Sequence, residues 1–335
     1  MENSNEKPTT IKVVATAGGF KTFIAFLAAM FIFAIVFFVG IISGAAGMSA
    51  AAESKNIFNK EIVNDGSSST IAILEVSGVI DGTNATYAKA AIDEILDDNN
   101  ITAVVLRVDS PGGGVTASDE IWHNMERIKD ANLPLIASYG GVAASGGYYI
   151  SCNADHIMAQ ETTITGSIGV IASIMTMEGL LEKIGIDPVT LIASDSPEKS
   201  VANDVYRNWT DKDKQKVGGM LDAMYDVFYR RVKDGRLNVV QDPKKLASVA
   251  NGSAYTAAEA LGNGLIDSIG YLEDAITLAI QQTKISSKNP TIIRYSQNEP
   301  MFSGFLGARA SRLSASDLRS LIQELSMPKL EFIYN

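Results

Sequence analysis

Ser145 is the residue whose surroundings point most directly to chemistry. It lies in the stretch GGVAASGGYYISC, residues 140–152, where glycine and alanine surround the hydroxyl. Small residues two positions before and after a serine are typical of a nucleophile elbow, a sharp strand-to-helix turn that exposes the hydroxyl. In such a turn the N–H of Gly146 can point toward an oxyanion. The alternative is a helix packed tightly on its neighbour, in which Ser145 only fills space.

A second glycine-rich loop could take part in the same chemistry. The stretch DSPGGGVTAS, residues 109–118, follows one strand-like run and opens a helical one. Backbone N–H groups at such a junction stabilise developing negative charge. The loop lacks the lysine and the spacing of a phosphate-binding loop. It therefore predicts a second oxyanion donor, or else an ordinary tight turn.

A serine nucleophile needs a base, and the two histidines are poor candidates. His123 lies on a helical run beside apolar residues, and His156 follows Ser145 by only eleven residues at the start of a strand. A lysine can serve if burial lowers its pKa. Lys199 lies in a predicted loop, whereas Lys183 lies in an amphipathic helix. On residue type alone, Lys199 is either this base or an exposed loop lysine.

The elements that must position these residues alternate between strands and helices. The β-α-β-α-β order predicts one α/β domain with a mostly parallel sheet covered by helices. Strands are predicted at 70–80, 103–109, 134–140, 156–159, 169–173 and 188–193, and helices at 86–98, 116–130, 177–185, 210–235, 255–270 and 271–284.

The amino terminus predicts a membrane anchor. Residues 23–42 form an apolar run of twenty residues, long enough to span a bilayer. Lysines precede this run, so the positive-inside bias places residues 1–22 in the cytoplasm and the domain outside the cytoplasmic membrane. A cleaved signal peptide is the alternative. We expect a linker over 43–69, the domain over 70–285 and a C-terminal extension over 286–335.

Composition excludes several other classes. The formal net charge of −10, without a polybasic block, argues against nucleic-acid binding through phosphates. Cys152 is the only cysteine, so no intrachain disulfide can form. Two histidines and no Cys/His ligand spacing argue against a metal centre. We expect no cofactor.

Four stretches in the same order, LRVDSPGGG, AASGGYYIS, TGSIGV and YTAAEALGNGLID, resemble the signal peptide peptidase A family. These are membrane-anchored Ser-Lys proteases of peptidase family S49. The resemblance implies a Clp-protease/crotonase-like ββα superhelix. Residue by residue, it implies that Ser145 is the nucleophile and Lys199 the general base. It also implies that Gly113 and Gly146 form the oxyanion hole and that Ser167 orients the lysine.

The stretch around Lys199 departs from the family pattern. The family reads Ser-Gly, two residues and Lys, followed by a proline, whereas SDSPEKSVAND has neither that glycine nor a later proline. Asp195 and Glu198 flank the lysine and would raise its pKa. We therefore expect both carboxylates to point away from the site.

The resemblance implies a membrane-bound serine endopeptidase that degrades short apolar peptides, such as released signal peptides. It also implies a homo-oligomeric ring or dome in which the serine of one copy meets the lysine of its neighbour. An inactive scaffold and a crotonase-like acyl-thioester enzyme are the alternatives. The apolar C-terminal stretch LEFIY could fold back toward the active-site groove as a self-substrate.

Overall fold

The computed structural model describes residues 57–240, 242–283, 289–298 and 330–333. The predicted cytoplasmic tail and membrane helix, residues 1–42, lie outside these residues. Within the described part of the chain, no helix has both the length and the apolar composition needed to cross a bilayer.

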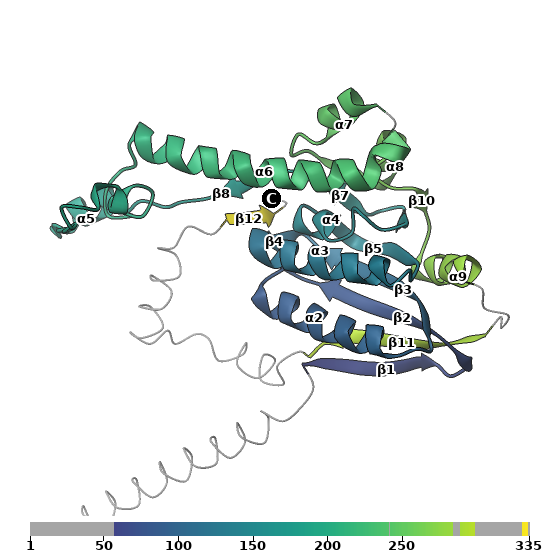
Figure 1. Cartoon of the computed structure of the whole chain (residues 1–335). Coiled ribbons are helices and arrows are strands. Elements are labelled where there is room, and N and C mark those ends of the chain that lie inside the picture. Colours follow the sequence, from purple (N-terminus) through teal and green to yellow (C-terminus); the bar gives the residue numbers. More distant parts are fainter. Residues whose placement is uncertain (1–56, 241, 284–288, 299–329, 334–335) are drawn as a thin grey trace, which may run out of the picture. The chain divides into compact units, whose positions relative to one another are not determined.

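The main sheet is mostly parallel, as the alternation of elements predicted (Figure 1). Its principal order is β1-β11-β2-β3-β5-β6-β10, with β7 beside β5 and β9 beside β7. Only the β1–β11 and β7–β9 pairs are antiparallel. The strands are β1 (Phe58–Asn64), β2 (Ser67–Ser77), β3 (Ile101–Ser110), β5 (Leu135–Ala144), β6 (His156–Ala159), β7 (Ile164–Gly166), β9 (Ala254–Thr256), β10 (Ser268–Ile269) and β11 (Pro290–Gln297).

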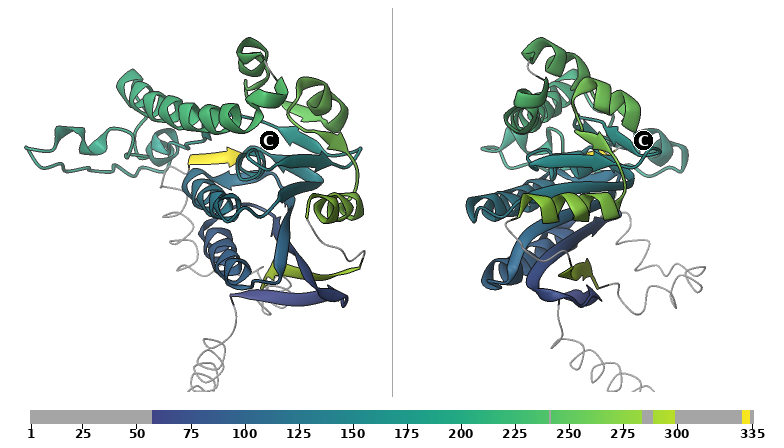
Figure 2. Two further views of the ribbon diagram at one scale, coloured as in Figure 1. Left: turned by 45° about the vertical axis from the view of Figure 1, so that its right-hand side comes forward. Right: turned by 90° about the vertical axis from the view of Figure 1, so that its right-hand side faces the viewer.

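Helices cover both faces of this sheet (Figure 2). α2 (Gly82–Asp97) and α3 (Val115–Asp130) belong to the larger hydrophobic core, and α9 (Leu272–Gln282) covers the opposite face. β2 contributes to a hydrophobic core on each face of the sheet. Leu74 belongs to the larger core, and Ile73 belongs to the smaller core under α9. A parallel sheet covered on both sides needs such nearly continuous apolar strands.

A second, smaller sheet forms beside the first glycine-rich loop. Its three strands, in the order β4 (Gly112–Gly114), β12 (Leu330–Ile333) and β8 (Ile171–Ala172), are antiparallel. The C-terminal strand thus lies between two strands that are far from it in the sequence.

A segment with many exposed residues, 173–210, precedes the long helix α6 (Asp211–Val240); we call it the arm. It carries α5 (Glu178–Lys183) and the 3-10 helix η1 (Pro197–Ser200). Residues 182–199 are all exposed, and the strand predicted at 188–193 does not form. This apolar run pairs with no strand among the described residues. α7 (Pro243–Val249) and α8 (Ala257–Asn263) follow α6.

The sheet extends beyond the predicted domain limits. β1 lies in the stretch predicted as a linker, and β11 lies in the predicted C-terminal extension. The two strands pair with each other, and β11 also pairs with β2. Strand pairing between segments more than 200 residues apart leaves no local signal in the sequence.

Candidate active site

Ser145 stands on the predicted turn. β5 ends at Ala144, and the single helical turn α4 (Gly146–Tyr149) begins directly after the serine. The Ser145 backbone has φ 53° and ψ −116°, a region that residues other than glycine rarely adopt. Its N–H donates to the Gly166 carbonyl at 2.8 Å, and its own carbonyl accepts from the Tyr149 N–H at 2.8 Å. Ser145 precedes the helical turn, so the alternative of a tightly packed helix in which it only fills space is wrong.

The Ser145 side chain is buried, and its Oγ has no hydrogen-bond partner among the described residues. A buried hydroxyl usually has a partner, so each exception calls for an explanation. One explanation is that the hydroxyl is held ready for a group that comes from elsewhere.

The two glycine-rich loops meet at this turn. A Cβ on Gly146 would lie 2.6 Å from Ser118 Oγ and 3.2 Å from the Gly113 nitrogen. A Cβ on Gly113 would lie 2.1 Å from the Ile80 carbonyl oxygen. Only glycine fits at both positions, so the two predicted oxyanion donors are neighbours.

Ser167 lies beside Ser145. Ala144 of β5 is paired with Gly166 of β7, so the two serines follow at the carboxyl ends of adjacent parallel strands. Ser167 has φ 50°, is 6% exposed and donates its N–H to the Ser253 carbonyl at 2.8 Å. Its position beside Ser145 is compatible with the orienting role that the resemblance implies.

Lys199 is the predicted residue that the structure does not bring to Ser145. It lies on η1 in the arm and is exposed. A pocket of about 180 Å³ lies beside it, lined by Thr190, Leu191, Ile192, Lys199, Ser200, Asn203, Asp204 and Tyr206. None of the other predicted site residues lines this pocket. Within one chain, the serine and the lysine belong to separate parts of the structure.

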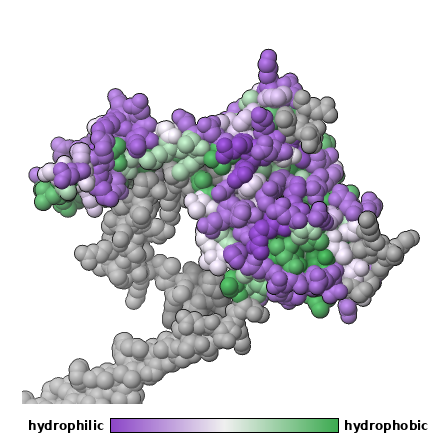
Figure 3. Space-filling view, viewed as in Figure 1, coloured by the Kyte–Doolittle hydropathy of each residue, from purple (hydrophilic) through white to green (hydrophobic). Residues whose placement is uncertain are grey.

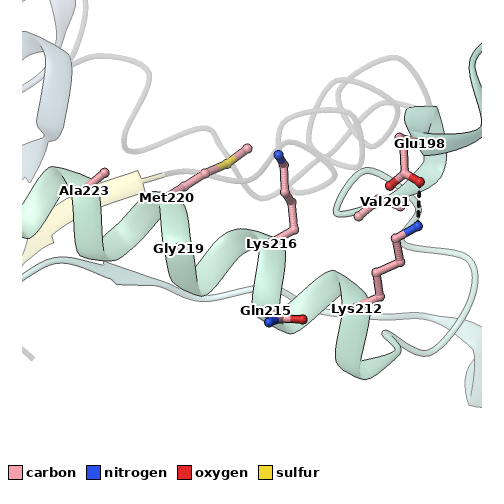
Figure 4. A pocket seen from close by; sticks show the side chains of 8 residues that line it. All are labelled: Glu198, Val201, Lys212, Gln215, Lys216, Gly219, Met220 and Ala223. Atoms are coloured by element: carbon pink, nitrogen blue, oxygen red, sulfur yellow. Dashed lines mark hydrogen bonds and ion pairs between the residues drawn. The ribbon is translucent and has the colours of Figure 1, made fainter.

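The acidic neighbour of Lys199 is paired elsewhere. The Glu198 carboxylate accepts from Lys212 Nζ at 2.5 Å, across a pocket of about 510 Å³ along α6 (Figure 4). Both side chains are 64% exposed, so this ion pair contributes little to stability. It does give the carboxylate a cation other than Lys199.

An extended chain segment lies next to the candidate site. β12 pairs with β4 in antiparallel register, with Phe332 opposite Gly113 and Ile333 opposite Gly112. On its other side, Leu330 is opposite Ala172 of β8. The edge of β4 that carries the predicted oxyanion glycine therefore accepts an extended polypeptide.

Sequence reasoning missed two residues that shape this site. Ser118 packs its Oγ against Gly146, and this buried hydroxyl has no partner among the described residues. Asp109 Oδ1 accepts from the Val142 N–H at 3.0 Å and so fixes the last part of β5. Both lie in the stretch DSPGGGVTAS, and a polar residue at each end of a glycine-rich loop was the available signal.

The residues that follow Ser145 have structural contacts. Tyr148 is buried and donates to the Leu265 carbonyl at 2.8 Å, and Tyr149 donates to Asp119 Oδ1 at 2.5 Å. Burial raises the pKa of the Cys152 thiol to about 12, so this cysteine is unreactive at neutral pH. In the described part of the chain, no group of three or more His, Cys, Asp or Glu side chains could hold a metal ion.

Comparisons with known proteins identify the family. Residues 127–286 match the model of peptidase family S49, a range that includes Ser145, Ser167 and Lys199 but not Gly113. The Synechocystis protein slr0021 is 30% identical over 229 residues, which are 68% of this chain and 80% of that protein. The chain belongs to peptidase family S49. The resemblance to the signal peptide peptidase A family is thereby confirmed.

Two further relatives are longer than the matched region. "Putative signal peptide peptidase SppA" of Enterococcus faecium is 36% identical over 205 residues, 61% of this chain and 57% of the relative. "Serine protease SPPA, chloroplastic" of Arabidopsis thaliana is 32% identical over 228 residues, 67% of this chain and 33% of the relative. The matched part of the chain thus spans between about one third and three fifths of these relatives.

Proposed function

We propose that the chain is a serine endopeptidase of the S49 type, with Ser145 as nucleophile and a lysine, Lys199, as general base. One observation carries this proposal. A buried serine hydroxyl without a partner among the described residues lies beside a strand edge that already accepts an extended polypeptide. A nucleophile, a backbone anion site and a peptide-binding edge are what peptide hydrolysis requires.

In the proposed reaction, Ser145 Oγ attacks the carbonyl carbon of the peptide while the lysine amine takes the serine proton. The resulting oxyanion is stabilised by the N–H groups of Gly113 and Gly146. The lysine ammonium then returns the proton to the departing amine, and an ester to Ser145 remains. Water, deprotonated by the same lysine, cleaves the ester, releases the acid and restores the serine.

The substrates we propose are short, mostly apolar peptides in extended conformation, including released signal peptides. An extended peptide can add as a strand to an exposed sheet edge, where backbone hydrogen bonds hold it. The geometry of β4, β12 and β8 supports this mode of binding. The printed name of the E. faecium relative supports the substrate class.

We further propose that the lysine is supplied by a neighbouring copy in a ring or dome. The support is the exposed position of Lys199 on the arm, together with a Ser145 hydroxyl that has no partner among the described residues. The remaining parts of this proposal are a Clp-protease/crotonase-like superhelix and an anchor at 23–42. That anchor would place residues 1–22 inside and the peptidase outside the cytoplasmic membrane.

A fluorophosphonate probe tests the nucleophile in the full chain in detergent. We expect Ser145→Ala to lose both labelling and cleavage of an apolar peptide, whereas the exposed control Ser248→Ala keeps both. Lys199→Arg should also be inactive, because a guanidinium does not deprotonate. The wild-type rate should rise with pH toward the range where lysine amines lose their proton. A folded wild-type chain that neither labels nor cleaves would instead identify an inactive scaffold.

A further inference from the structure

The junction between the arm and α6 contains a buried carboxylate with an unusual number of donors. Asp213, in the first turn of α6, is fully buried. Its Oδ2 accepts from the Thr210 N–H at 2.8 Å, the Thr210 hydroxyl at 2.5 Å and Arg207 Nη1 at 2.7 Å. Its Oδ1 accepts from Arg207 Nη2 at 2.8 Å and the Ala202 N–H at 2.9 Å. These contacts hold the pKa of this carboxyl well below its usual range, with the Arg207 hydrogen bonds as the largest cause.

Only part of this arrangement is needed to begin a helix. The reciprocal contacts of Thr210 and Asp213 cap α6 as a Thr-x-x-acid capping box does. The contacts of Arg207 and Ala202 are additional, and both lead back into the arm. Arg207 Nη2 donates to the Ser200 carbonyl at 3.0 Å as well as to Asp213. The buried carboxylate therefore ties down the backbone one and three residues after Lys199.

The backbone held in this way is otherwise unfavourable. Ala202 has φ 62°, a left-handed conformation that an alanine rarely adopts. Its N–H is the group that Asp213 accepts. The ion pair of Arg207 and Asp213 thus stabilises a turn whose left-handed conformation is unfavourable for Ala202.

The rest of the arm near Lys199 offers little support. Residues 182–199 are exposed throughout, and the Lys212–Glu198 pair is exposed as well. In Figure 4 the Glu198 segment lies over the start of α6 with Val201 between them. The hydrogen bonds of Asp213 to Ala202 and of Arg207 to Ser200 are therefore the support nearest to the loop that carries Lys199.

We propose that Arg207 and Asp213 position Lys199 for catalysis; we call this pair, with its contacts to Ser200 and Ala202, the clamp. The inference rests on the proposed role of Lys199 as base. A base on an exposed loop that must reach a serine on another copy needs a rigid mount, because small misplacements of catalytic groups cost large factors in rate. Within the pair the two charges balance; Arg207 Nε also lies 3.7 Å from Oδ2 of Asp204, a carboxylate that lines the pocket beside Lys199. Arg207 and Asp213 are positioning residues and do not touch the substrate.

The test uses the full chain in detergent with three variants and one matched control. Arg207→Lys keeps the charge but loses the bidentate contact and the link to Ser200. Asp213→Asn removes the charge, and Asp213→Glu keeps both the charge and a good capping residue. The control, Asp211→Asn, makes the same change two residues away at a fully exposed site whose contact is with Lys214.

We expect Arg207→Lys and Asp213→Asn to lower kcat by about tenfold or more, with KM within about twofold of wild type. Peptide binding uses β4 and β8, which the clamp does not touch. Asp213→Glu should recover part of the loss, and Asp211→Asn should match wild type. If Asp213→Asn does not fold, Arg207→Lys and Asp213→Glu decide the outcome.

A second readout does not depend on activity. Trypsin cleavage after Lys199, followed by mass spectrometry, should be faster in Arg207→Lys and Asp213→Asn than in Asp211→Asn. A wild-type chain that cleaves no peptide contradicts the proposed function, while the trypsin comparison still reports on the clamp. A wild-type chain that is active, with kcat unchanged in Arg207→Lys, would overturn the positioning role.

Discussion

The backbone conformation of Ser145 is energetically unfavourable, so the surrounding structure must stabilise it. A residue held in a sparsely populated region of φ/ψ space costs about 1–3 kcal/mol and persists only where its neighbours hold it there. Here the Gly166 carbonyl accepts from the Ser145 N–H, and the Tyr149 N–H donates to the Ser145 carbonyl. The contacts with strand β7 and the helical turn α4 hold the Ser145 backbone in this conformation.

The contact between Gly146 and Ser118 provides a test of this packing. In Gly146→Ala, the new methyl group would lie 2.6 Å from Ser118 Oγ, and activity should fall strongly. Ser118→Ala alone should be close to neutral, because that hydroxyl has no partner among the described residues. The double variant should regain stability relative to Gly146→Ala, by about 1 kcal/mol or more of coupling.

Thermal melting and peptidase assays on wild type, the two single variants and the double variant complete this double-mutant cycle. Strict additivity of the two changes would contradict the close packing of Ser118 on Gly146. Activity is expected to recover less than stability, because the Gly113 nitrogen remains 3.2 Å from the added methyl group.

Residue types predicted the nucleophile turn but not the clamp. Small residues around Ser145 and the PGGG loop carry a local signal, since only glycine tolerates such close approach. Nothing in the residue types or the spacing of Arg207 and Asp213 indicated a link to Lys199. Thr210-x-x-Asp213 has the Thr-x-x-acid spacing of a capping box. The Asp213 carboxylate also accepts a hydrogen bond from the backbone after Lys199. No spacing of residue types in the sequence indicates this tertiary contact.

At the scale of elements, the long central strands and helices were predictable because their hydrophobic pattern is strong. β3 and β5 are nearly continuous apolar runs, and α3 presents one apolar face. The failures have a different cause. β1 and β11 reach the sheet through partners distant in sequence, and 188–193 is apolar but exposed and pairs with no strand among the described residues. Composition predicts strand tendency, whereas the partner decides whether a strand forms.

The β12 strand gives an element-scale prediction. If an extended peptide substrate uses the same edge of β4, the C-terminal strand competes with it. Removing the residues after Ala315 should therefore lower KM for a short apolar peptide by about threefold or more, with kcat little changed. The full chain treated with the same peptide is the reference.

A second variant tests the same strand pairing while it keeps the full length of the chain. Replacing Phe332 with Pro removes one backbone N–H and should weaken pairing with β4. It should therefore lower KM in the same direction as the truncation. An unchanged KM in both variants would show that β12 and the substrate use different surfaces.

At the scale of the whole molecule, the arm exposes apolar side chains that a single chain leaves uncovered. Met175, Val189 and Leu191 are 70%, 79% and 90% exposed, and Figure 3 shows apolar atoms at the end of the arm. Contiguous exposed apolar surface marks an interaction site. Lys199 lies on the same segment, so contact of the arm with a second copy would carry the lysine to another chain.

Two mixing experiments on the full chain in detergent separate a shared site from one assembled within a single chain. In a head-to-tail ring, each site takes its serine from one copy and its lysine from the next. An equal mixture of Ser145→Ala and Lys199→Ala should then regain about a quarter of wild-type activity, because each of the two neighbours is the required variant about half of the time. Each variant alone stays silent.

The converse mixture makes the distinction quantitative. Wild type co-assembled with an equal amount of the double variant, Ser145→Ala with Lys199→Ala, should retain about a quarter of full activity if sites are shared between copies. If each chain assembles its own site, about half remains, since every wild-type copy works alone. Mixed assembly is verified by pull-down through a tag on one variant only. Half activity in this mixture, together with silence in the first, would place Lys199 beside Ser145 of its own chain and require the arm to fold back.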